Sequence, residues 1–140
     1  MSKKPRVLFL CTQNAARSQM AEAFLRHYAG DRFEIHSAGL EPHEIHPLTY
    51  QVMEERGLDL SEHRAKSLFE YYMKMHIGYL ITVCSNAEDK CPIMPLVGER
   101  IYWPLEDPAA FEGSDEERLA KFREVRDQVE QYVQTWTSEH

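Results

Sequence analysis

Hydrophobic positions along the chain fall into short runs that predict strands and into spaced sets that predict helices. Residues 6–11 form an almost continuous apolar run, which is typical of a strand buried on both faces. After a polar loop, apolar residues recur at helical spacing up to Gly30, which is a suitable helix stop. Further strands are predicted at residues 33–37, 77–84 and 100–103.

The remaining polar and apolar positions predict three more helices and one long loop. One helix should begin at His46-Pro47 and end before Gly57, and residues 67–70 resemble a capping box before a short helix. Residues 85–98 are polar and contain two prolines, so we expect a loop. A second capping box at residues 114–117 precedes a long terminal helix, whose apolar stripe consists of Leu119, Phe122, Val125, Val129, Tyr132, Val133 and Trp136.

This alternation of strands and helices predicts an α/β fold. We expect a three-layer α/β/α sandwich with a four-stranded parallel sheet, in a single domain that spans residues 1–140. In such sheets, ligands bind at the loops that leave the carboxyl ends of the strands. The loop after the first strand, Cys84 and the segment after the last strand all fall at this edge.

Composition excludes several classes of protein. The chain has 140 residues, 43% of them apolar, which is enough for one core. Its net charge of −7 and the absence of long basic runs argue against nucleic acid as a partner. No apolar run approaches the roughly 18–20 residues of a membrane span, and the run after Lys3-Lys4 is too short for a signal peptide. We therefore expect a cytoplasmic protein, mature from its first residue and monomeric.

The loop after the first strand carries residues suited to binding an oxyanion. Its backbone N–H groups and the following helix N-terminus attract negative charge, and the Arg17 guanidinium can bind two oxygens of a tetrahedral anion. The same field should favour the thiolate of Cys11, with Ser18 donating a hydrogen bond to the sulfur. Asn14 tolerates a left-handed backbone. The alternative is a buried structural cysteine before an ordinary turn. The predicted binding residues are Thr12, Gln13, Asn14, Ala15, Ala16, Arg17 and Ser18.

The spacing Cys11-x5-Arg17-Ser18, continued by Gln19-Met-Ala-Glu22, resembles the low-molecular-weight protein tyrosine phosphatase superfamily. The resemblance covers essentially the whole chain, with further matching stretches at residues 37–39, 57–61, 84–92 and 106–108. The two later cysteines make the chain most similar to the arsenate reductase branch, whose members typically couple to thioredoxin.

Cys84 and Cys91 form a Cys-x6-Cys pair. Without the resemblance, they read as a buried strand-end cysteine and an incidental loop cysteine. A zinc site is disfavoured because the spacing is not standard and no histidine pair completes it; His43 and His46 read as surface histidines. If residues 84–91 were helical, the Cα atoms would be about 10 Å apart. A disulfide needs roughly 4.4–6.8 Å, so oxidation should remodel this segment.

The resemblance implies a relay of thiols that reduces arsenate. Cys11 would attack arsenate while Asp107 acts as general acid, Cys84 would attack Cys11, and Cys91 would attack Cys84, leaving a disulfide for thioredoxin. Asp107-Pro108 alone is also a common turn pair. The alternative is a phosphatase that hydrolyses phosphomonoesters through a cysteinyl-phosphate on Cys11. A third reading is an oxyanion-binding redox regulator without enzymatic activity.

Several positions depart from the family pattern. Gln13 stands where glycine is usual and places a side chain beside the anion pocket, and Ala16 stands where a further cysteine is usual. Residues 109–111 lack the tyrosine that is common in the phosphatase branch. Some arsenate reductases bind potassium near residues matching Asn14, Glu22 and Ser37. Lys66 stands where the remaining acidic ligand is expected, which disfavours a structural potassium ion here, and we expect no other cofactor or metal.

Overall fold

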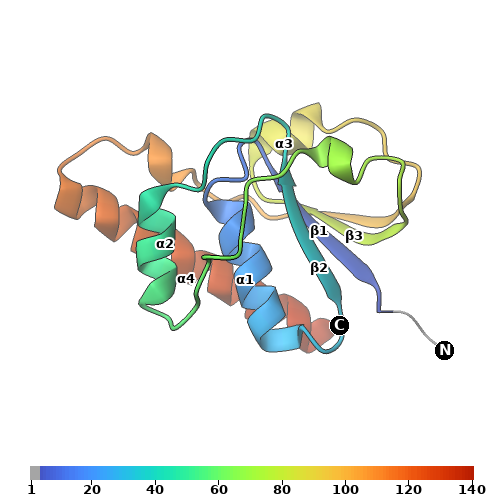
Figure 1. Cartoon of the computed structure of the whole chain (residues 1–140), viewed down its shortest axis with the longest axis horizontal. Coiled ribbons are helices and arrows are strands. Elements are labelled where there is room, and N and C mark those ends of the chain that lie inside the picture. The colour runs from blue at the N-terminus through green and yellow to red at the C-terminus, as the bar shows by residue number, and fades with distance from the viewer. Residues whose placement is uncertain (1–3) are drawn as a thin grey trace.

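The computed structural model describes residues 4–140, so the first three residues of the predicted 1–140 domain lie outside the described part. The strands form one sheet in the order β2-β1-β3-β4, with every pair parallel (Figure 1). This confirms the predicted α/β fold and its four-stranded parallel sheet. The elements in chain order are β1 (Arg6–Cys11), α1 (Arg17–Ala29), β2 (Glu34–Gly39), α2 (Pro47–Glu54), η1 (Leu68–Glu70), β3 (Ile77–Thr82), α3 (Ser85–Lys90), β4 (Val97–Tyr102), η2 (Pro108–Ala110) and α4 (Asp115–Glu139).

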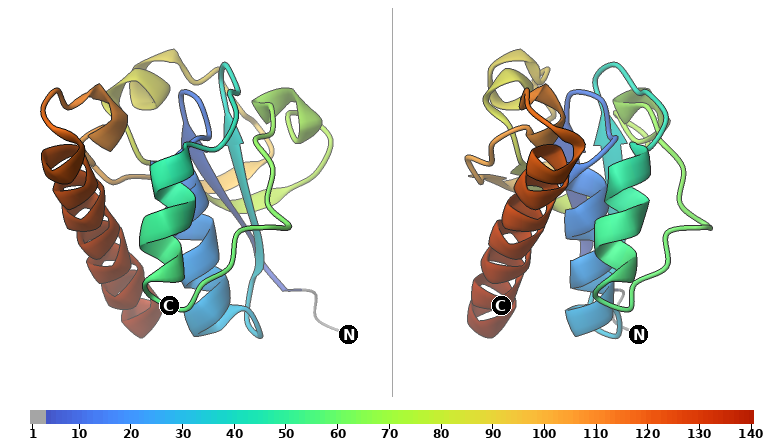
Figure 2. Two further views of the ribbon diagram at one scale, coloured as in Figure 1. Left: turned by 60° about the vertical axis from the view of Figure 1, so that its left-hand side comes forward. Right: turned by 90° about the vertical axis from the view of Figure 1, so that its left-hand side faces the viewer.

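The two faces of the sheet are covered unequally. Successive strand side chains point to opposite faces. On one face, the ring of Tyr79 lies 5.1 Å from that of Trp136 in α4. On the other face, His36 packs 5.0 Å from Tyr71, and Thr82 donates a hydrogen bond to Glu88 of α3. The three long helices therefore form one layer, in which α4 contacts both α1 and α2 (Figure 2). Shorter segments around η1 and α3 form the other.

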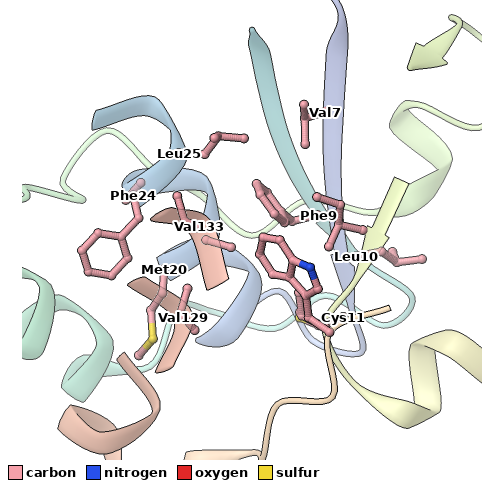
Figure 3. Close-up of a cluster of buried hydrophobic side chains, with 14 of the residues drawn as sticks. Val7, Phe9, Leu10, Cys11, Met20, Phe24, Leu25, Val129 and Val133 are labelled. Carbon is pink, nitrogen blue, oxygen red and sulfur yellow. The ribbon is translucent and has the colours of Figure 1, made fainter. Parts of the chain in front are cut away.

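The core centres on β1, in which residues Val7, Leu8, Phe9 and Leu10 are completely buried. Burial of such side chains contributes about 1.5–3 kcal/mol each. Because Cys11 ends this strand, the core fixes the position of its backbone. Figure 3 shows buried side chains of this strand together with side chains of two helices from that layer, among them Met20, Phe24 and Leu25 of α1 and Val129 and Val133 of α4.

The prediction of a continuous loop at residues 85–98 is wrong, because this segment contains α3 and the start of β4. The Sγ atom of Cys84 accepts a hydrogen bond from the Ala87 N–H (3.3 Å) and so caps α3, while the Ala87 side chain is fully buried. β4 is one of the two edge strands of the sheet, and its residues 98–100 are exposed, which explains why no apolar run marks its beginning.

Two local predictions also need correction. Residues 68–70 form only a 3-10 turn, because Glu70 pairs with Arg64 (2.6 Å) instead of closing a capping box. His46 is not a surface loop residue, since its Nδ1 accepts a hydrogen bond from the Leu48 N–H (3.0 Å) and its ring packs on Phe122 (4.7 Å). The capping box at residues 114–117 is confirmed. No helix formed by residues 4–140 has the length and apolarity needed to cross a bilayer.

Candidate active site

The loop between β1 and α1 surrounds the sulfur of Cys11 with hydrogen-bond donors. The Asn14 N–H donates to Sγ (3.1 Å), and the Ser18 hydroxyl lies 2.8 Å from it. Since the Ser18 oxygen already accepts a hydrogen bond from Asn14 Nδ2 (2.7 Å), its own proton is available to the sulfur. Asn14 adopts the left-handed conformation (φ 55°), as predicted for a loop without glycine.

A cavity of about 290 Å³ opens over this loop and brings most of the predicted site residues together. Asn14 and Ser18 do not line it, because both are fully buried behind the loop. Cys91 does not line it either. Ser85 and Asn86 also line it, although neither is a predicted site residue, because the sequence pattern predicts only a loop for their segment. The complete lining consists of Cys11, Thr12, Gln13, Ala15, Ala16, Arg17, Cys84, Ser85, Asn86, Asp107 and Ala109.

Arg17 and Asp107 meet at the edge of this cavity. The Arg17 guanidinium donates to the Leu105 carbonyl (3.1 Å) and lies 3.8 Å from a carboxylate oxygen of Asp107. The other oxygen of Asp107 accepts a hydrogen bond from the Ala109 N–H (3.0 Å) and caps η2. Asp107 can therefore both form a turn with Pro108 and serve as a general acid, because the turn points a half-exposed carboxylate into the cavity.

The second and third thiols lie at opposite ends of α3. Cys84 is buried, and its Sγ lies 3.5 Å from the hydroxyl of Thr12, which also accepts a hydrogen bond from Asn86 Nδ2 (2.7 Å). Cys91 is half-buried at the other end, where its Sγ lies 3.8 Å from the sulfur of Met94. All three cysteines are free thiols. The fold thus places Cys84 in the cavity of Cys11 and keeps Cys91 outside it.

Burial raises the pKa of the Cys11 thiol above its ordinary value. The hydrogen bond from Ser18, the charge of Arg17 and the N–H of Asn14 each lower it but do not fully offset the burial. These donors and Arg17 act in the predicted direction, because each favours the thiolate, but burial outweighs them. The sequence shows the donors, but it does not show how completely the sulfur is removed from water.

The residues that resemble a potassium site do come together beneath the loop. Asn14 Nδ2 donates to the Ser37 hydroxyl (3.0 Å), which in turn donates to Glu22. However, the Lys66 ammonium lies 3.4 Å from both the Glu22 carboxylate and the Ser37 hydroxyl, in the position a cation would need. A potassium ion does not fit this arrangement. Within residues 4–140, no cluster of His, Cys, Asp and Glu side chains is suited to a metal ion.

Comparison with known proteins places the chain in a family. The sequence profile described as low molecular weight phosphotyrosine protein phosphatase matches residues 6–139. The chain belongs to this family. It is 40% identical over 136 residues to an arsenate reductase of Halalkalibacterium halodurans, covering 97% of this chain and 96% of that protein. An arsenate reductase of Shouchella clausii is 42% identical over 129 residues, covering 92% and 91%.

The solved structures agree with this assignment. A structure described as an arsenate reductase in the phosphate binding state is 29% identical in sequence and superposes with a TM-score of 0.79. The match covers 96% of this chain and 98% of the other. The resemblance inferred from the spacing of Cys11, Arg17 and Ser18 is thus confirmed.

In this member of the family, the loop between β1 and α1 is expected to bind the oxyanion and is called the anion loop below. Gly39 at the end of β2 supports this loop through close backbone packing. A Cβ atom at this position would lie 2.8 Å from the Thr12 carbonyl oxygen and 2.9 Å from the Asn14 nitrogen. Immediately after it, the N–H groups of Leu40 and Glu41 donate to the carbonyls of Cys11 (3.1 Å) and Thr12 (2.8 Å). The loop therefore has a rigid wall that only glycine permits.

We expect Gly39→Ala to deform the anion loop, because backbone atoms cannot move aside as flexible side chains do. The substitution should lower the free energy of unfolding by about 1–3 kcal/mol and weaken the binding of inorganic phosphate. Urea unfolding and calorimetric titration with phosphate measure the two effects. The matched control is Gly98→Ala, whose Cβ would meet the Gly78 carbonyl at 2.9 Å, away from the loop. It should destabilise the protein but retain phosphate affinity, and equal losses of affinity would contradict this expectation.

The raised pKa of Cys11 predicts how its alkylation depends on pH. Below the pKa, the thiolate fraction grows tenfold per pH unit, so the rate with iodoacetamide should rise throughout the range from about pH 6 to about pH 8.5. Ser18→Ala should lower the rate at any pH in this range, because it removes a donor that stabilises the thiolate. Mass spectrometry of the modified Cys11 peptide follows the reaction, with the exposed Ser138→Ala as control. A plateau at or below neutral pH would show that the thiol pKa is lowered.

Proposed function

We propose that this protein reduces arsenate to arsenite by a relay of its three thiols, regenerated by thioredoxin in the cytoplasm. The observation that carries the proposal is the position of Cys84, which lines the same cavity as Cys11 and Arg17. A phosphatase of this family needs no second thiol there. The similarity of the chain to arsenate reductases also supports this proposal.

In the first step, Cys11 attacks the arsenic of arsenate held by the loop N–H groups and Arg17. A bond forms between sulfur and arsenic, one oxygen leaves, and Asp107 donates a proton so that it departs as water. The proton of the Cys11 thiol passes to an oxygen of the bound oxyanion as the sulfur attacks. The Ser18 hydroxyl, 2.8 Å from Sγ, stabilises the charge that develops on the sulfur.

In the second step, the thiolate of Cys84 attacks the sulfur of Cys11. The sulfur–arsenic bond breaks, its electron pair remains on arsenic, and arsenite leaves with arsenic reduced by two electrons. A disulfide then joins Cys11 to Cys84. Cys91 next attacks Cys84, which frees the Cys11 thiol and leaves a Cys84–Cys91 disulfide. Thioredoxin, a dithiol reductant, restores both thiols and takes over the disulfide.

The assay that tests this proposal follows NADPH oxidation with arsenate, thioredoxin and thioredoxin reductase. The wild type should turn over, Cys84→Ser and Cys91→Ser should each fall to background, and Asp107→Asn should be slower by about 10²-fold or more. Hydrolysis of p-nitrophenyl phosphate is the control, since it requires Cys11, Arg17 and Asp107 but neither later thiol. Absence of arsenate-dependent oxidation, with phosphatase activity that survives both cysteine substitutions, would establish a phosphatase instead.

Formation of the Cys84–Cys91 disulfide should unwind α3. These cysteines flank the helix, so their Cα atoms lie about 10 Å apart, well beyond the roughly 4.4–6.8 Å that a disulfide permits. Closing the bond must break the hydrogen bonds from the Glu88 and Cys91 N–H groups to the carbonyls of Cys84 and Ala87. Hydrogen exchange of these two amides should therefore be faster in the oxidised protein.

The control for this measurement is Cys91→Ser treated with the same oxidant, in which α3 should keep its protection. Amides of α1 should exchange equally in all samples, because that helix is packed against α4 and takes no part in the change. Unchanged protection of α3 in oxidised wild type, with the Cys84–Cys91 disulfide verified by peptide mapping, would show that the helix accommodates the bond.

A further inference from the structure

One buried cation takes no direct part in the proposed chemistry. Lys66 precedes η1, and its residue surface is only 8% exposed. Its ammonium contacts the Glu22 carboxylate and the Ser37 hydroxyl, both at 3.4 Å, and donates to the Arg64 carbonyl (3.1 Å). Lysine is rarely buried without a partner, because the desolvation of an ammonium is unfavourable. Here a carboxylate, a hydroxyl and a carbonyl surround it.

This ammonium is connected to the anion loop by hydrogen bonds. The Ser37 hydroxyl donates to Glu22 and accepts from both Lys66 and Asn14 Nδ2 (3.0 Å), so its hydrogen-bonding capacity is fully used. The backbone N–H of Lys66 donates to Asn14 Oδ1 (2.9 Å). Asn14 in turn donates its own N–H to the Cys11 sulfur. The backbone of Lys66 therefore holds the side-chain amide of Asn14 directly, and its ammonium does so through Ser37.

The charge of Glu22 explains why an ammonium is needed. Its carboxylate is almost completely buried, and one oxygen pairs with Arg26 (2.9 Å) while the other faces Lys66 and Ser37. Burial alone would raise the pKa of Glu22, but Lys66 first, then Ser37, Arg26 and His63, bring it below its ordinary value. Without Lys66, the second oxygen would face only a neutral hydroxyl in a buried site.

We propose that the Lys66 ammonium acts as a tethered cation that makes the anion loop independent of any dissolved monovalent cation. It neutralises Glu22, and Glu22 and the ammonium together orient Ser37, which holds the Asn14 amide and hence the left-handed turn beneath Cys11. Lys66 is thus a positioning residue for oxyanion binding, whichever reaction follows. A chain with a neutral residue at this position would need a free cation next to Glu22.

The test compares phosphate binding in potassium chloride and in choline chloride at equal ionic strength. Phosphate affinity is measured by calorimetry and by protection of Cys11 from iodoacetamide. Wild type should bind equally in both salts. Lys66→Gln should bind about tenfold more weakly in choline chloride, because hydrogen bonds to a charged group are lost, and potassium should restore most of the affinity.

Two further variants complete the experiment. Lys4→Gln is the matched control, because its ammonium also donates to a backbone carbonyl, that of Gly30, but far from the loop; it should behave as wild type. In Glu22→Gln/Lys66→Gln, the carboxylate that would hold potassium is absent, so the weakened affinity should not respond to the salt. Neither probe depends on arsenate reduction, so a failure here leaves the proposed reaction unaffected.

Several results would overturn the proposal. These are a wild-type affinity that depends on potassium, a Lys66→Gln affinity equal to that of wild type in choline chloride, or a loss that is the same in both salts. Unfolding of Lys66→Gln in both salts, followed by circular dichroism, would also overturn it, since potassium would then fail to replace the ammonium. A double variant that responds to potassium would do the same.

Discussion

The site depends on the hydrogen bonds that the backbone and side chain of one buried residue, Asn14, make. Its backbone N–H points at the Cys11 sulfur, its side-chain nitrogen donates to Ser18 and Ser37, and its side-chain oxygen accepts from the Lys66 backbone. Because every polar atom of the side chain has a partner, the strained left-handed turn is held from several directions at once. The nucleophile, its hydroxyl donor and the layer beneath the loop are therefore parts of one hydrogen-bonded unit.

The two walls of the cavity differ in how firmly they are held. The loop wall follows a fully buried strand and is braced by the backbone after Gly39. The wall that carries Cys84 and Asn86 belongs to a helix of six residues with one fully buried side chain. A rigid oxyanion cradle thus faces a segment whose opening disrupts few contacts. This division suits a reaction that must fix its substrate but rearrange its thiols. The net charge of −7 does not oppose this, since Arg17 and the loop donors act on the anion at short range.

Much of this arrangement is predictable from the sequence, and what is not has two physical causes. β1 and α1 have strong patterns, and Cys11 and Arg17 stand out by their spacing at a strand–helix junction. The helix α3 is not predicted because its cap is a thiol and its only buried residue is Ala87, so no apolar stripe marks it. The raised pKa of Cys11 and the burial of Lys66 were also missed. Both depend on how completely distant segments exclude water, which no local pattern reports.

The sulfur of Cys84 both caps α3 and is the proposed second nucleophile. As long as it accepts the Ala87 N–H, it helps to keep Cys91 a helix length away. Once that sulfur is bonded to Cys11, it becomes a poorer acceptor and the helix loses part of its anchor. In the proposed relay, the third thiol would therefore gain access only after the second has reacted. Such timing would protect the resting protein against premature disulfide closure without a partner protein that sets the order of the steps.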